Sequence, residues 1–231
     1  MMKKKIFLIA WTATLLVGCS SDNPMLPIDD CNGNSGEDEN QSLVSPTVRA
    51  TVNTINGSES PMTGILEVYP CLSGTSIYYG NYVQNTLTPL PGMYTLKDGN
   101  TSGDPNRPIS LPVGPYNMIY WGTPKYEEPI YAHPLMRDPV YILGEDMSRQ
   151  HFSLFKMEAD TTYYPVFDLV HAVQPANIGS EDLKASLKRV VTGLKVIIKD
   201  KNNGILSSSI DSMVVRITNI AGELNFYTAA P

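Results

Sequence analysis

The chain is short of cysteine, of basic residues and of long apolar runs, and each shortage excludes a class of protein. Three cysteines and three histidines occur in 231 residues, and His133, His151 and His171 are too scattered to match the ligand spacing of a metal site. No run approaches the ~18 uninterrupted apolar residues of a membrane-spanning helix. The net charge is −6, which argues against nucleic-acid binding because phosphates are held by clustered Lys and Arg.

Signatures of catalysis are also missing. The sequence contains no G-x-S-x-G, H-E-x-x-H, P-loop or Rossmann glycine pattern. Carboxylates such as Glu127 and Glu128 are adjacent, and neighbours in a strand point to opposite faces, so adjacency gives no acid–base geometry. DGNTSG (98–103) begins like a calcium loop, but Ile109 stands where the bidentate glutamate is required. We therefore expect a protein that is not an enzyme and holds no metal or cofactor.

The first 18 residues predict export. Three lysines (3–5) precede an apolar stretch (6–17) that is shorter than the ~20 residues needed to span a bilayer but fits the hydrophobic region of a secretory signal. The stretch ends in LVGC (16–19), which resembles the bacterial lipobox. We expect residues 1–18 to be removed and Cys19 to carry diacylglyceryl and N-acyl chains, which together hold a protein at a membrane. A secreted protein with an incidental cysteine is the alternative.

Residues 19–45 predict a lipidated, flexible tether. From residue 20 onward they hold six acidic residues and no basic one, with many Ser, Asn, Gly and Pro. Such a segment cannot bury enough apolar surface to offset the entropy of ordering. Cleavage after residue 18 removes three lysines and no acidic residue, so the net charge falls from −6 to −9. We expect a lipid-anchored protein of the outer membrane that faces the cell surface.

The two remaining cysteines leave the disulfide state open. With Cys19 acylated, Cys31 and Cys71 could form one bridge in an exported protein. Cys31 lies in the tether, however, and nothing in the sequence shows that it reaches Cys71. Bridged and free thiols are both compatible with the pattern.

Residues 46–231 predict one all-β domain. The chain has 18 prolines, 17 glycines and 13 tyrosines, a composition that favours strands and turns over helices. Short apolar or alternating runs, separated by Gly, Pro and Asn turns, indicate an antiparallel β-sandwich. The candidate strands are residues 47–55, 62–70 (ended by Pro70), 76–84, 107–122 (with a hairpin-like join at 113–115), 150–158, 163–173, 186–200 and 212–220.

The clearest alternation lies at residues 186–200. Leu194, Val196 and Ile198 fall on one face of a strand there. A competing interpretation makes residues 180–191 a helix, with a serine cap and acidic residues in the first turn. We expect a short helix or coil there, followed by the strand.

Aromatic residues supply the only candidate binding surface. Tyr78, Tyr79, Tyr82 and Trp121 lie in or beside stretches broken by Pro and Gly. Exposed aromatic side chains suit sugar stacking and protein interfaces alike. Tyrosines are also ordinary residues of a sandwich core, so the sequence leaves a structural and a binding role open.

Four features together resemble a known family. The lipobox cysteine, the acidic tether, LPVGPYNMIYWG (111–122) and LKRVVTGLKVIIKD (187–200) are similar to fimbrillin-type lipoproteins of Bacteroides-like bacteria, closest to the FimB/Mfa-type anchor subunits. The resemblance covers roughly residues 45–227. It implies transthyretin-like sandwich domains and a subunit at the base or tip of a fimbria. Members usually carry two such domains, and this chain has room for little more than one, so two interpretations of residues 46–231 stay open: a short variant with one domain, or the first of two domains in a truncated sequence.

The resemblance also implies how such a subunit meets its partners. Subunits of this family join by adding a strand to an exposed sheet edge. We therefore expect a membrane-anchored anchor or accessory subunit of a fimbria, with fimbrial subunits as partners and no nucleic acid. The alternative is a surface glycan-binding lipoprotein that uses exposed tyrosines, with a host protein or glycan as partner.

Overall fold

The computed structural model describes residues 42–54, 56–103, 106–124, 136–137, 141–154, 168–200, 204 and 206–231. All of them belong to one compact unit, Asn40–Pro231. The predicted signal, the lipidation site Cys19 and nearly all of the tether lie outside these residues. Within the described part of the chain, no helix has the length and apolarity needed to cross a membrane.

The described residues form strands joined by turns, with one short 3₁₀ turn at Met147–Arg149. The strands are β1 (Leu43–Val44), β2 (Val48–Asn53), β3 (Glu59–Pro61), β4 (Gly64–Leu72), β5 (Asn81–Val83), β6 (Thr86–Thr88), β7 (Gly92–Lys97), β8 (Asn100–Thr101), β9 (Leu111–Pro112), β10 (Gly114–Thr123), β11 (Met136–Arg137), β12 (His151–Leu154), β13 (Val170–Ile178), β14 (Leu183–Arg189) and β15 (Glu223–Asn225).

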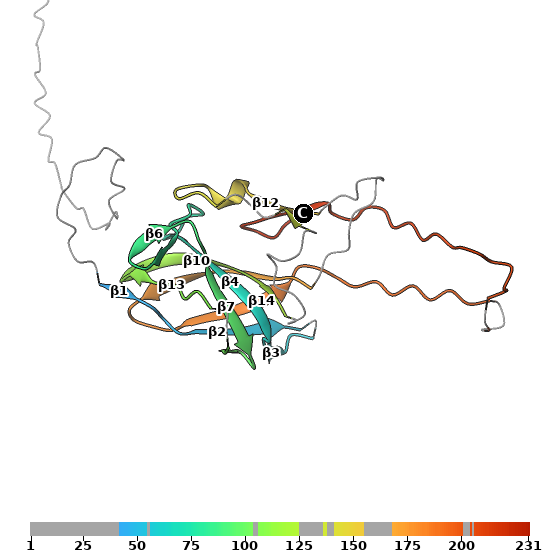
Figure 1. Ribbon diagram of the computed structural model, residues 1–231, viewed down its shortest axis with the longest axis horizontal. Coiled ribbons are helices and arrows are strands. Elements are labelled where there is room, and N and C mark those ends of the chain that lie inside the picture. The colour runs from blue at the N-terminus through green and yellow to red at the C-terminus, as the bar shows by residue number, and fades with distance from the viewer. Residues whose placement is uncertain are drawn as a thin grey trace, which may run out of the picture. The chain divides into compact units, whose positions relative to one another are not determined.

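The main sheet has the strand order β14-β13-β10-β4-β7-β8-β2-β3 (Figure 1). Its neighbouring strands are antiparallel. One parallel pair joins β14, at one end of the sheet, to β2, the strand next to the other end, so the sheet closes on itself around an apolar core. The all-β antiparallel sandwich predicted from the sequence is confirmed, and the β14–β2 pair is the detail that alternation alone did not indicate.

Strand β10 is mostly apolar because both of its faces are covered from Tyr116 onward. Tyr116, Met118 and Tyr120 point into the core enclosed by the sheet, whereas Ile119 and Trp121 point into a second core on the other face. Alternate residues of a strand point to opposite faces, so a strand buried on both sides needs no polar alternation. The second core is covered by a smaller sheet of order β11-β12-β15.

The glycine that ends the β10 motif permits a close approach of two strands. A Cβ on Gly122 would lie 2.9 Å from the carbonyl oxygen of Ile65 and 2.7 Å from the end of the Met62 side chain. Gly122 pairs with Leu66 in the β10–β4 ladder. The backbone contact leaves no room for a larger residue here.

Two predictions around β4 and β10 are wrong. Pro70 does not end a strand, since β4 continues to Leu72. The Pro70 carbonyl accepts the N–H of Tyr79 at 2.9 Å, on the side of β4 that faces away from β10. The nitrogen of Pro70, which has no hydrogen to donate, faces the same side. The β4–β10 ladder therefore loses no hydrogen bond at Pro70. The join at 113–115 is not a hairpin, because β9 pairs with β1 while β10 is occupied by β4 and β13 on its two edges.

The predicted strand at 76–84 is confirmed only at its end, as β5. Ile77 and Tyr78 form isolated bridges instead. Gly80, at φ 92°, takes a conformation that interrupts a regular strand. The segments 155–158 and 163–167 of two other candidate strands lie outside the described residues.

The largest error concerns residues 186–200. The helix alternative is wrong, because β14 is a strand, and the strand interpretation is wrong beyond Arg189, where β14 ends. Its partner β2 ends at Asn53, opposite Lys188. The last backbone bond runs from the N–H of Val190 to the carbonyl of Leu169 at 3.1 Å. Alternating side chains beyond that point have no strand to pair with.

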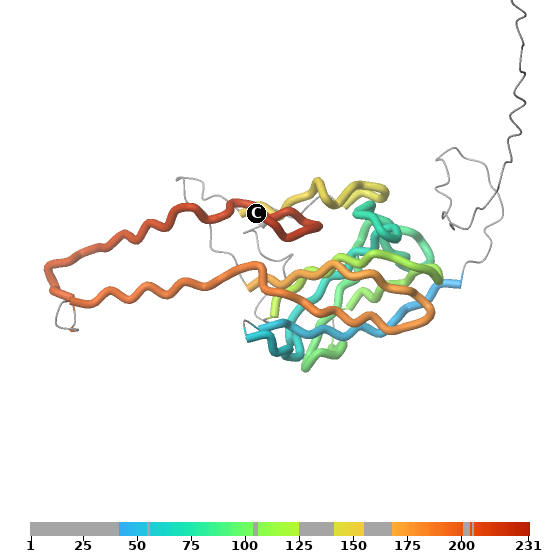
Figure 2. The backbone as a smooth tube through the Cα atoms, turned by 180° about the vertical axis from the view of Figure 1, so that it is seen from behind, coloured from blue at the N-terminus to red at the C-terminus, as the bar shows by residue number. Residues whose placement is uncertain are grey.

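Residues 212–220 fail as a strand prediction for the same reason. They run as extended backbone (Figures 1 and 2) and pair with no strand of the described residues. Most of their apolar side chains are exposed. A period of two in sequence indicates a pleated backbone, but a strand needs a neighbour that accepts its hydrogen bonds.

Candidate functional site

Two extended segments carry most of the exposed apolar surface. We call residues 190–200 arm 1 and residues 206–220 arm 2. Figures 1 and 2 show the arms running side by side, arm 1 in orange and arm 2 in red. Ten of the fourteen large apolar residues exposed among the described residues lie in the arms: Leu194, Val196, Ile197, Ile198, Ile210, Met213, Val214, Val215, Ile217 and Ile220. Exposed apolar side chains gathered in this way indicate an interaction site.

The bases of the two arms line one apolar groove of about 510 Å³. Arm 1 contributes Val190 to Leu194, and arm 2 contributes Ile217 and Ile220. Its floor comes from the second core, from Phe152 and its neighbours: Leu154, Leu169 and Leu224. The groove is therefore continuous with packed protein at one end and with both arms at the other.

The predicted aromatic surface is only half available. Tyr78 is 1% exposed and Trp121 is fully buried, so the expectation of exposed stacking rings is wrong for these two residues. Burial follows from the position of Trp121 on β10, where its ring packs 4.6 Å from Phe152 and its Nε1–H donates to the carbonyl of Phe226 at 2.9 Å. Tyr79 and Tyr82 are half-buried and remain candidates for a binding role.

Buried tyrosines near Trp121 have satisfied hydroxyl groups. The Tyr69 hydroxyl donates to the Glu67 carboxylate at 2.5 Å and lies 2.9 Å from the Tyr141 hydroxyl. Burial, followed by the nearby negative charge of Glu67, raises the pKa of Tyr69 well above its usual range. The Tyr78 hydroxyl donates to the carbonyl of Pro89 at 3.2 Å. These groups hold the core together and offer no free donor to a ligand.

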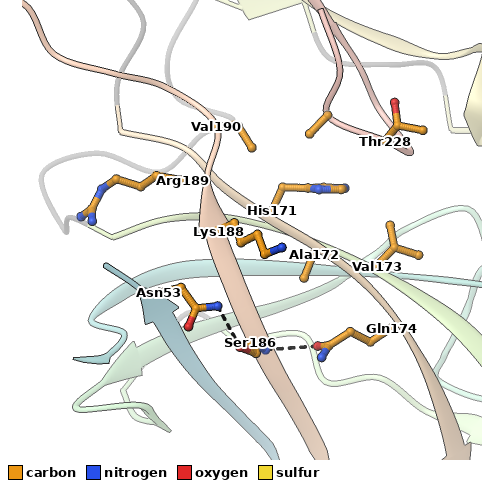
Figure 3. A pocket seen from close by; sticks show the side chains of 11 residues that line it. Asn53, His171, Ala172, Val173, Gln174, Ser186, Lys188, Arg189, Val190 and Thr228 are labelled. Atoms are coloured by element: carbon orange, nitrogen blue, oxygen red, sulfur yellow. Dashed lines mark hydrogen bonds between the residues drawn. The ribbon is translucent and has the colours of Figure 1, made fainter. Parts of the chain in front are cut away.

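A polar pocket of about 650 Å³ opens beside β13 and β14 (Figure 3). These two strands are paired only at Val170–Arg189 and His171–Lys188. Beyond those pairs the Gln174 side chain accepts the N–H of Ser186 at 3.1 Å, and Asn53 donates to the Ser186 hydroxyl at 3.1 Å. Side chains thus replace the ladder bonds where the strands diverge, and the pocket is the result.

His171 lines this pocket but is itself 8% exposed. Its ring lies 4.5 Å from that of Trp121. Its Nε2 has no hydrogen-bond partner within the described residues. Burial lowers the pKa of His171 from 6.5 to about 4, opposed in part by a hydrogen bond to the Tyr227 backbone. The imidazole is therefore neutral at neutral pH.

Cys71 is buried and forms no disulfide with any of the described residues. Burial, together with the charge of Asp146, raises its pKa to about 12, so the thiolate needed for chemistry does not form. Cys31, its candidate partner, lies outside the described residues, and the disulfide remains a prediction. In the ranges that the structure covers, His, Cys, Asp and Glu form no group of three that could hold a metal ion.

Neither the exposed arms nor the pocket lined by His171 was predicted from the sequence. The arms alternate apolar and polar residues just as a paired strand does, so the sequence did not indicate that their apolar side chains are exposed. His171 was considered only as a metal ligand, and no local pattern indicated that β13 and β14 diverge beside it. The charge pattern of the arms was visible in the sequence and could have drawn attention to them.

Comparison with known proteins gives one family and one weak structural likeness. The family model described as fimbrillin-A associated anchor proteins Mfa1 and Mfa2 matches residues 39–231. A search of curated proteins gave no significant match. A crystal structure from Bacteroides thetaiotaomicron, provisionally described as a polysaccharide-binding protein, aligns at 12% identity and a TM-score of 0.42. The alignment covers 63% of this chain and 46% of that one, so the chain spans less than half of that protein.

Proposed function

Because the chain belongs to the family of fimbrillin-A associated anchor proteins, we propose that it fixes a fimbria to the cell as an anchor or accessory subunit. Acyl chains on Cys19 hold it in the outer membrane, and the acidic tether up to residue 45 places the folded part at the surface. Strand addition joins it to neighbouring fimbrial subunits. The observation that carries this proposal is the family match over residues 39–231.

The physical properties of the chain support this role. Two or more acyl chains bind a bilayer firmly, so a lipidated subunit stays at the membrane and suits the terminal position of a filament. The exposed apolar arms at 190–200 and 206–220 supply a surface that a neighbouring subunit can cover. The role requires no catalysis, in keeping with a family of structural subunits.

The glycan-binding alternative has lost most of its basis. It required exposed tyrosines and tryptophan, and Tyr78 and Trp121 are in the core. Tyr79 is half-buried, with its ring packed at 5.4 Å against Tyr116. Stacking platforms present a ring face to solvent, so we prefer the anchor role.

Deletion of the gene tests the proposal. We expect fimbriae to leave the cells and accumulate in the culture medium, or to change in length, because their attachment to the membrane is lost. Electron microscopy of cells and medium counts the filaments, and a plasmid copy of the gene should restore attachment. Unchanged, cell-bound filaments in the deletion strain would reject the anchor role, and polysaccharide pull-down would then be the next experiment.

A further inference from the structure

Among the described residues the main chain of the arms makes few backbone hydrogen bonds, and most of the large apolar side chains of the arms are exposed. The last backbone bond of arm 1 (190–200) is the one from Val190 to Leu169, and the backbone bond within arm 2 (206–220) is a local turn from Ile210 to Ser207. Within the described residues no ladder joins one arm to the other. Unpaired extended segments are templates for an added strand, and the arms present two of them.

Most of the apolar side chains of the arms face one side. Leu194 and Ile217 both line the groove at the base of the arms. Because side chains alternate along extended backbone, Val196 and Ile198 lie on the same side of arm 1 as Leu194. Met213 and Val215 likewise lie on the same side of arm 2 as Ile217. These side chains form an apolar strip that continues from the groove along both arms. Asn219, at φ 61°, resets the alternation and returns Ile220 to the groove.

The opposite side of the arms carries basic residues. Lys195 and Lys199 lie there on arm 1, and Arg216 lies there on arm 2. The segment 190–220 holds four basic and two acidic residues, in a chain whose net charge is −6. Opposite charges on neighbouring strands stabilise a sheet and like charges destabilise it. An acidic strand is therefore favoured between the arms, and the basic arm of a second copy is disfavoured.

We propose that the arms accept between them an extended segment of a partner fimbrial subunit, in which apolar residues alternate with acidic ones. This inference rests on the function proposed above and names the site and the chemistry of strand addition. The added segment pairs with both arms, antiparallel to one and parallel to the other, because the arms run in opposite directions. Its apolar side chains extend the strip at Leu194 and Ile217, and its carboxylates lie near Lys195, Lys199 and Arg216.

A labelled peptide tests the chemistry directly. The probe is fluorescein-tagged Val-Glu-Val-Glu-Val-Glu-Val, a length typical of one strand, and the control replaces each Glu by Lys. Fluorescence anisotropy with the purified full chain in detergent should show binding of the Glu peptide and none of the Lys peptide. Replacing both Lys195 and Lys199 by Glu should reverse this preference.

Matched variants test the side of the arms that is used. Leu194→Ser and Ile217→Ser should each weaken binding of the Glu peptide by about tenfold or more, since each removes one exposed aliphatic side chain that the bound peptide would bury. Ile197→Ser and Val214→Ser are the controls, because both side chains are exposed, belong to the same arms and point away from the strip. These controls should leave the affinity unchanged, and all four variants should keep the wild-type circular dichroism spectrum.

Three outcomes would overturn the inference. Equal binding of the Glu and Lys peptides would remove the charge argument. Equal loss in the strip variants and their controls would remove the sidedness. A dimer in light scattering that Leu194→Ser converts to a monomer would assign the arms to a second copy of the chain.

Cells separate this inference from the proposed function. If deletion of the gene sheds filaments but the Leu194→Ser, Ile217→Ser double variant retains them, the anchor role stands and the arms are not the strand-addition site. If deletion has no effect on filaments, the anchor role fails, and the peptide experiment still decides whether the arms bind an acidic strand. Filaments shed by the double variant, but not by the Ile197→Ser, Val214→Ser control, agree with both.

Discussion

Replacing Trp121 by alanine is expected to destabilise the protein by about 3–5 kcal/mol, the usual cost of removing a buried tryptophan. The side chain is fully buried on β10. Its ring contacts Phe152 of β12 and Phe226 just after β15, and its Nε1–H donates to the Phe226 carbonyl. The substitution therefore opens a cavity in the second core and leaves a buried carbonyl without its donor.

Urea unfolding followed by far-ultraviolet circular dichroism measures this loss. Fluorescence is unsuitable, because Trp11 is the only other tryptophan and lies in the predicted signal. Tyr79→Ala is the control: its ring is half-buried against Tyr116, so the loss should be clearly smaller. A Trp121→Ala variant of near wild-type stability would contradict the packing described here and revive a ligand-stacking role for this residue.

Stability is expected to fall between pH 6.5 and about pH 4 because of His171. Its pKa is about 4 in the folded protein and about 6.5 in an unfolded chain. Above pH 6.5 the imidazole is neutral in both states, and stability is full. As the pH falls toward 4, the unfolded state binds a proton that the folded state excludes, which costs up to about 3 kcal/mol, of which about 2 kcal/mol is lost by pH 5.

The measurement is the free energy of unfolding at pH 7 and at pH 5. His171→Phe retains a ring beside Trp121 and cannot be protonated, so its stability should change less between these two pH values than that of the wild type. His151→Gln, at an exposed position on β12, is the matched control. The same pH dependence in wild type and His171→Phe would show that the imidazole is not excluded from protonation by the fold.

The sequence predicted the strands that are marked by apolar runs and bounded by turn signals. The apolar run of residues 111–122 indicated a buried strand, and β10 is buried on both faces. Val48–Asn53 and Gly64–Leu72 were located closely because apolar residues and turn signals bound them. The closing pair, β14 with β2, was not predictable from the sequence, since it joins segments about 135 residues apart through backbone bonds that any residues can make.

The arms show why alternation can mislead. Residues 186–200 alternate as regularly as any part of the chain, yet only the portion up to Arg189 is a strand, because β2 and β13 both stop there. The aromatic residues were ambiguous for the same reason. The sequence shows that they are present but not whether they are buried. Trp121 is buried because β12 and β15 pack over β10. A sequence pattern specifies which face is apolar, and the neighbouring element decides whether that face is covered.

The most direct test of the anchor role replaces one atom at the predicted lipid site. Cys19→Ser, expressed from the chromosomal gene, exchanges a thiol that can be acylated for a hydroxyl group and leaves the folded residues unchanged. The measurement is the ratio of fimbriae on washed cells to fimbriae in the medium. Our account predicts that this ratio falls as far as it does in the deletion strain. A wild-type ratio, with the variant present at its normal level, would contradict the claim that the lipid on Cys19 holds the filament to the cell.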